Sequence, residues 1–174
     1  VIITEELLPF TQSIAEAVSL ANYQPSAAYK TGKAAEKLKK EFIAEFIPIF
    51  NKSLSREQVE TAKKNFQRGL EIGKTANEVK DWVNAPPNFA TPQFFEELAK
   101  KIGKETGAKL TILYKKELQK LGMNTLLAVN RGSPDDARLV ILEYTPKNAD
   151  KKLAPLALVG KGIIFDSGGY NLKP

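Results

Sequence analysis

The sequence contains no cysteine and no histidine among its 174 residues. The absence of cysteine excludes disulfides, cysteine nucleophiles, zinc sites with cysteine ligands and iron–sulfur clusters from this chain. The absence of histidine excludes histidine-based catalytic triads and zinc sites built on paired histidines. The side chains left for chemistry are carboxylates, lysines, arginines, tyrosines and hydroxyls.

The sequence also lacks long hydrophobic runs. No stretch approaches the roughly 18 apolar residues that a membrane span needs, and no cationic start followed by an apolar stretch marks a signal peptide. The composition, 43% hydrophobic and 26% charged, excludes a disordered or fibrous chain. We therefore expect a folded cytoplasmic protein with no membrane partner.

Positive charge is in excess, with a formal net charge of +6. Most of the excess lies in the middle of the chain, where lysine pairs such as Lys63-Lys64 and Lys100-Lys101 are interleaved with acidic residues. No aromatic residues alternate with these lysines, as a surface that stacks nucleic-acid bases would require. The pattern favours a solvated helix face, and we do not expect nucleic acid as a partner.

The strongest local signal predicts a long helix over residues 55–83. Ser55 and Gln58 fit a capping box, and apolar residues then recur every three or four positions as far as Val83. The pair Pro86-Pro87 forbids continuation of the helix. A helix of this length exceeds what a small domain needs internally, so we interpret it as a connector between two bodies.

Signals on either side of this helix predict further elements. A helix over 5–21 is broken near Pro9, a loop covers 23–40, and 42–50 is a strand that Pro48 confines to a sheet edge or interrupts. After the long helix, Thr91 and Pro92 open a helix that closes around Gly107. The remaining predicted elements are strands at 110–114, 138–144 and 156–159 and short helices at 115–121 and 124–129.

These elements define an α/β fold. We expect residues 1–54 to be the remainder of an α/β N-terminal domain, 55–84 an interdomain helix, and 85–174 the first half of a second α/β domain. Because the strands at 138–144 and 156–159 are near-continuous apolar runs, we expect them to be buried on both faces of a mixed or parallel sheet.

The residues that suggest chemistry follow the last predicted strand, where open α/β sheets place their ligand sites. Gly160 and Gly162 flank Lys161, and Gly168-Gly169 follow Asp166-Ser167. The spacing fits neither a phosphate-binding P-loop nor a dinucleotide fingerprint, and a serine nucleophile at Ser167 has no histidine to activate it. Each of these residues, taken alone, is equally typical of an ordinary turn.

The whole stretch nevertheless resembles the first active-site block of the leucyl aminopeptidase family, also called the cytosol aminopeptidase or M17 family. The resemblance rests on 159–162, 165–169 and 171–174, read as VGKG, FDSGG and NLKP. Upstream, the runs at 83–88, 121–129 and 138–146 occur in the order and spacing of that family, and the helix at 55–83 resembles its interdomain helix.

The resemblance implies removal of the N-terminal amino acid from a peptide, by two divalent metal ions and a bridging water or hydroxide. It assigns Asp166 as the bridging metal ligand and Lys161 as an amine ligand, which must be neutral to bind metal. Burial and adjacent cations are what lower a lysine pKa from about 10.4. It assigns Lys173 as the catalytic lysine that polarises the scissile carbonyl and stabilises the oxyanion.

The resemblance further implies Zn²⁺, Mn²⁺ or Mg²⁺ as the metal, peptides with a free N-terminus as substrates, a homohexamer, and a bicarbonate held by residues outside this chain. The family's other acidic ligands and the arginine that holds bicarbonate follow the motif that ends at Pro174. Two readings therefore stay open, a fragment of the enzyme and a truncated relative without activity. The alternative function is a noncatalytic binding or assembly module, with nucleic acid as one candidate ligand.

Overall fold

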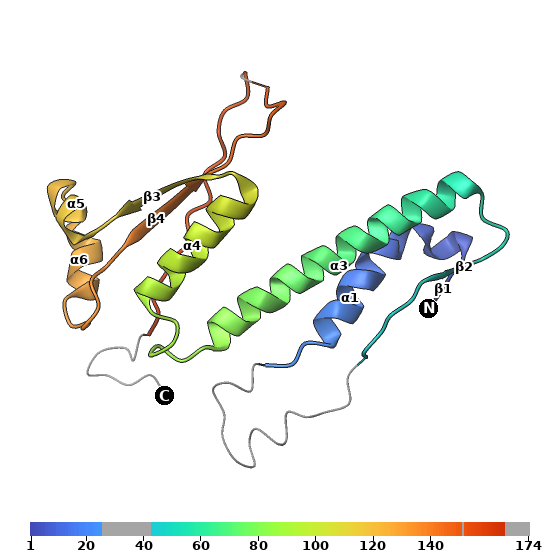
Figure 1. Ribbon diagram of the computed structural model, residues 1–174, viewed down its shortest axis with the longest axis horizontal. Helices are drawn as coiled ribbons and strands as arrows, with labels where there is room; N and C mark the ends of the chain where they lie inside the picture. The colour runs from blue at the N-terminus through green and yellow to red at the C-terminus, as the bar shows by residue number, and fades with distance from the viewer. Residues whose placement is uncertain (26–42, 151, 166–174) are drawn as a thin grey trace, which may run out of the picture. The chain divides into compact units, whose positions relative to one another are not determined.

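The computed structural model describes residues 1–25, 43–150 and 152–165 and shows an α/β chain (Figure 1). The chain divides into two compact units, Val1–Ala85 and Pro86–Pro174. The sequence-based domain assignment of 1–54, 55–84 and 85–174 stays a prediction. In the described residues, no helix is both long and apolar enough to cross a membrane.

The first unit is built on two helices that pack along each other. A 3-10 turn, Glu5–Phe10, contains Pro9 and leads directly into α1, Thr11–Ala21, which confirms the predicted break and the end at Asn22. Helix α3, Arg56–Asn84, is continuous. Its Ser55 side chain accepts a hydrogen bond from the Gln58 N–H, and the Gln58 side chain accepts one from the Ser55 N–H, which confirms the capping box.

Two glycines of α3 let the helices approach closely. A Cβ added at Gly69 would lie 2.2 Å from the carbonyl oxygen of Gln12, and one added at Gly73 would lie 2.5 Å from the Ser19 Cβ. Ala15 and Ala62 are buried in the same unit. The helix predicted as a connector thus also supplies part of the core of the first unit.

The strand predicted over 42–50 is wrong in extent. The only strand in its described part is β2, Ile49–Phe50, which pairs in parallel with β1, Ile2–Ile3. Phe46 instead stacks on Phe66 of α3, with ring centroids 5.4 Å apart. Pro48 has no N–H to donate to a strand ladder, and the paired register begins at Ile49, although the Val1 amino group also donates to the Ile47 carbonyl. The predicted loop at 23–40 lies mostly outside the described residues.

The second unit consists of helix α4, Pro92–Thr106, a pair of strands and two short helices. The Thr91 side chain caps the start of α4, and Gly107 ends it with a φ of 72°, a left-handed conformation that favours glycine. The other elements are β3 (Lys109–Leu113), α5 (Lys115–Lys120), α6 (Asn124–Asn130) and β4 (Leu139–Glu143). All of them match the sequence predictions to within one or two residues.

Strands β3 and β4 are antiparallel, with Leu110 opposite Leu142. A Cβ on Gly103 of α4 would contact both of these leucines, so α4 covers that face of the pair. The expectation of a strand buried on both faces is wrong for β4, because Ile141 is 37% exposed and Leu142 is 39% exposed. The described strands of the second unit form one antiparallel pair, which is compatible with the expected mixed sheet but not with an all-parallel one.

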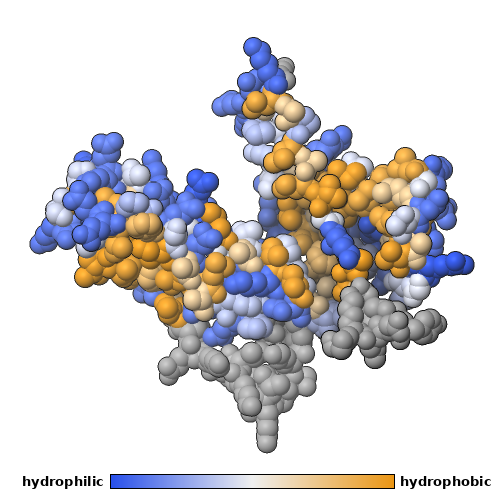
Figure 2. Space-filling view, turned by 180° about the vertical axis from the view of Figure 1, so that it is seen from behind, coloured by the Kyte–Doolittle hydropathy of each residue, from blue (hydrophilic) through white to orange (hydrophobic). Residues whose placement is uncertain are grey.

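The strand predicted at 156–159 is absent from the structure. These residues have no regular secondary structure, and Leu156, Leu158 and Val159 are 86%, 89% and 96% exposed. An apolar run becomes a buried strand only where neighbouring strands and a covering layer meet it, and the described residues place none against this run. Exposed hydrophobic side chains occur on both units (Figure 2).

Candidate functional site

Of the three predicted site residues, only Lys161 lies in the described part of the chain. It is exposed and stands in a segment without helix or strand. A Cβ added at Gly160 or at Gly162 would meet no atom within 4 Å, so neither glycine is required here by close packing. Asp166 and Lys173 lie outside the described residues.

The described residues therefore do not test whether the predicted site comes together. Within residues 1–25, 43–150 and 152–165, no three carboxylates are grouped so that they could hold a metal ion. The roles of Lys161 and Asp166 as metal ligands and of Lys173 as the catalytic lysine stay predictions. The amine and carboxylate donor types are compatible with Zn²⁺ or Mn²⁺, but two donors are fewer than two ions require.

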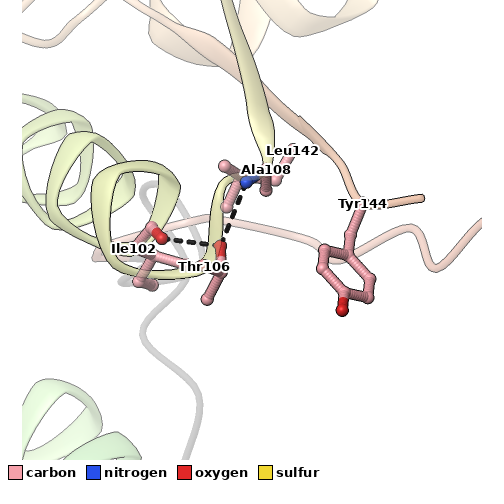
Figure 3. Close-up of a pocket in the computed structure, with 5 residues that line it drawn as sticks. All are labelled: Ile102, Thr106, Ala108, Leu142 and Tyr144. Atoms are coloured by element: carbon pink, nitrogen blue, oxygen red, sulfur yellow. Dashed lines mark hydrogen bonds between the residues drawn. The ribbon is translucent and has the colours of Figure 1, made fainter. Parts of the chain in front are cut away.

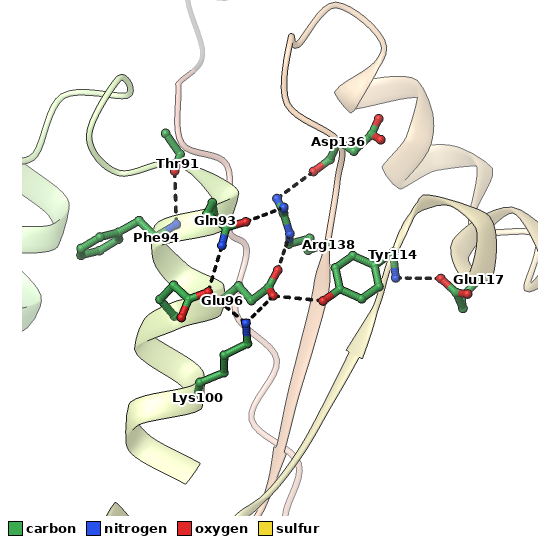
Figure 4. Close-up of polar contacts among 10 residues, drawn as sticks. Thr91, Gln93, Phe94, Glu96, Lys100, Tyr114, Glu117, Asp136 and Arg138 are labelled. Atoms are coloured by element: carbon green, nitrogen blue, oxygen red, sulfur yellow. Dashed lines mark hydrogen bonds and ion pairs between the residues drawn. The ribbon is translucent and has the colours of Figure 1, made fainter. Parts of the chain in front are cut away.

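A polar cluster surrounds Glu96 of α4, which is 4% exposed (Figure 4). One carboxylate oxygen lies 2.6 Å from Nε of Arg138, at the start of β4. The other lies 2.8 Å from Nζ of Lys100 and accepts a 3.0 Å hydrogen bond from the Tyr114 hydroxyl, at the end of β3. One glutamate thus ties α4 to the ends of both strands.

The contacts of this cluster fix its protonation states. The hydrogen bond from Lys100 lowers the pKa of the Glu96 carboxyl; burial opposes this, and the hydrogen bond from Tyr114 and the ion pair with Arg138 add to it. Hydrogen bonds to Glu96 and Glu97 raise the pKa of Lys100. The hydrogen bond to Glu96 raises the pKa of Tyr114. At neutral pH the glutamate is ionised and Lys100 and Tyr114 keep their protons, as in a structural ion-pair network.

Sequence reasoning missed this cluster, although one signal was present. Glu96 precedes Ala99 by three residues, so it lies on the side of α4 that is buried. A carboxylate on a buried helix face needs a cation or hydrogen-bond donors. The partners, Tyr114 and Arg138, come from two other elements and have no recognisable spacing.

An open pocket of about 400 Å³ lies where α4 ends and β3 begins (Figure 3). Its lining consists of Ile102, Thr106, Ala108, Leu142 and Tyr144. The Thr106 hydroxyl donates to the Ile102 carbonyl at 2.7 Å and accepts from the Ala108 N–H at 3.2 Å. The pocket therefore offers mainly apolar surface and none of the three predicted site residues.

Comparison with known proteins identifies the family. Residues 77–174 match the family model described as "Cytosol aminopeptidase family, catalytic domain". This match includes Lys161, Asp166 and Lys173 and begins within the last turns of α3.

Individual relatives agree, each named "Probable cytosol aminopeptidase". The chain is 36% identical over 171 residues to the protein of Nitrosococcus oceani, covering 98% of this chain and 32% of that protein. It is 43% identical over 119 residues to that of Chromobacterium violaceum, covering 68% of the chain and 23% of the relative. It is 44% identical over 117 residues to that of Chlorobaculum tepidum, covering 67% of the chain and 23% of the relative.

The chain thus spans about a quarter to a third of the length of these relatives. Near-complete coverage of the chain in one relative and the catalytic-domain match over residues 77–174 lead to one assignment. The chain belongs to the cytosol aminopeptidase family.

Proposed function

We propose that this sequence forms part of a metal-dependent aminopeptidase that releases N-terminal amino acids of the leucine type from peptides. The observation that carries the proposal is the match of residues 77–174 to the catalytic domain of the cytosol aminopeptidase family. The matched region contains an amine, a carboxylate and a second amine, at Lys161, Asp166 and Lys173.

Each of these side chains has a distinct task in the proposal. Lys161, as a neutral amine, and Asp166, as a carboxylate, hold metal. Two bound divalent ions would supply an activated water and a Lewis acid for the scissile carbonyl. Lys173 keeps its proton and donates to the carbonyl oxygen, so its charge stabilises the oxyanion as it develops.

The rest of the proposed enzyme lies outside these 174 residues. The two donors leave most of the coordination of two ions to further acidic ligands, and a bicarbonate is to be held by an arginine elsewhere. We propose Zn²⁺, Mn²⁺ or Mg²⁺ as the metal, a homohexamer as the assembly, and the cytoplasm as the location. The support for these properties is membership of the family.

The two lysines provide the sharpest test, made in a longer protein that contains this sequence and is active. Lys161→Ala should lose bound metal, whereas Lys173→Ala should keep its metal and lose kcat by a factor on the order of 10² to 10³, as expected for one oxyanion donor. Metal content and the kinetics of leucine amide hydrolysis are measured on both variants. Lys147→Ala, a change at an exposed lysine in the loop after β4, is the matched control.

The outcomes separate the possible roles. Loss of metal from the Lys173 variant would overturn the role assigned to that lysine. Unchanged kinetics in both lysine variants would overturn the site as a whole. An unchanged Lys147 variant shows that losing a surface lysine does not by itself affect the enzyme.

The structure gives the noncatalytic alternative little support. On α3 the exposed cations are interleaved with glutamates, and Lys63 forms a 2.9 Å ion pair with Glu60. On α4, Lys100 pairs with Glu96 and Glu97. Such alternation is typical of a solvated helix and gives no continuous positive surface for a phosphate backbone.

A further inference from the structure

We draw no further inference here: the strongest candidate, the open apolar pocket between α4 and β4 lined by Ile102, Thr106, Ala108, Leu142 and Tyr144, is an unpartnered apolar surface, and nothing in the described residues shows what covers it.

Discussion

A single carboxylate, Glu96, joins three elements of the second unit. Its contacts with Arg138, Lys100 and Tyr114 mean that α4 and the ends of both strands share one buried charge. The Arg138 side chain is only 18% exposed. Removing the glutamate would leave that guanidinium poorly solvated and without its carboxylate. An uncompensated buried charge of this kind strongly lowers the stability of the folded state.

We predict that Glu96→Gln destabilises the second unit and flattens its stability-against-pH profile. Because the pKa of Glu96 is lowered in the folded state, its contribution is complete above the ordinary glutamate pKa of about 4.3. That contribution is lost as the pH falls through the lowered folded value. The measurement is urea unfolding at several pH values between neutral and acid, followed by the NMR signals of β3 amides.

The adjacent glutamate provides the control for this prediction. Glu97 also contacts Lys100, at 2.9 Å, but it is 57% exposed. Glu97→Gln should therefore change the urea midpoint much less than Glu96→Gln. Equal effects of the two substitutions would show that the buried contacts of Glu96 with Arg138 and Tyr114 add no stability beyond that of an exposed ion pair.

At the scale of elements, the packing of α1 on α3 depends on glycine. The carbonyl of Gln12 occupies the space where a side chain on residue 69 would begin, and the α1 backbone cannot move away without shifting the whole helix. Intrinsic helix propensity alone would favour alanine over glycine at this position. The close approach of the two helices therefore favours glycine at position 69 more strongly than helix propensity favours alanine.

We predict that Gly69→Ala lowers the free energy of unfolding by about 1–3 kcal/mol, the usual range for overpacking. Urea unfolding can be followed by the fluorescence of Trp82, the single tryptophan, which lies in α3. Gly132→Ala is the matched control, because a Cβ there meets no atom within 4 Å. A stability gain in the Gly69 variant would mean that the helices separate at little cost.

Elements with strong local signals could be predicted from the sequence, and those that depend on distant partners could not. The cap at Ser55 and the double proline define α3, and Thr91 with Gly107 define α4, because all of these act within one turn of the helix end. The strands expected at 42–50 and 156–159 have the right residue types. Strand formation also needs a neighbour, which composition does not specify.

The same difference between local and distant signals applies to the candidate site. The motif around Lys161 can be found because its residues are contiguous, whereas the Glu96 cluster is assembled from three elements and was missed. Resemblance supplied the roles of Asp166 and Lys173, and spacing alone would have left them as turn residues. Physical reasoning from the sequence could exclude other sites here but could not by itself establish this one.

At the scale of the whole molecule, the chain matches about a quarter to a third of the length of its cytosol aminopeptidase relatives. Its relatives are about three times as long, since 171 aligned residues make up 32% of one and 119 make up 23% of another. The described residues contain no cluster of three carboxylates that could hold a metal. Two-metal catalysis requires several ligands in fixed geometry. The proposed chemistry therefore needs more metal ligands than Lys161 and Asp166.

We predict that the 174-residue chain, expressed alone, does not hydrolyse leucine amide or a leucyl peptide, even with added zinc or manganese. Lys161 and Asp166 are its only proposed ligands, and they cannot complete the coordination of two ions. The assay is release of free leucine, with a longer active protein containing this sequence as the positive control in the same buffer. Metal-dependent turnover by the isolated chain would contradict the ligand assignment.

The exposed run at 156–159 also affects how the isolated chain behaves in solution. Residues 156–159 are four consecutive exposed apolar residues without helix or strand structure, a pattern on which a second chain can add as a strand. We expect light scattering to rise with protein concentration, and Leu158→Lys to suppress that rise. Val83→Lys is the matched control, because Val83 is 78% exposed but lies in a helix, where the backbone cannot pair as a strand. The colloidal stability of this chain would then depend on four residues that add nothing to its packed core.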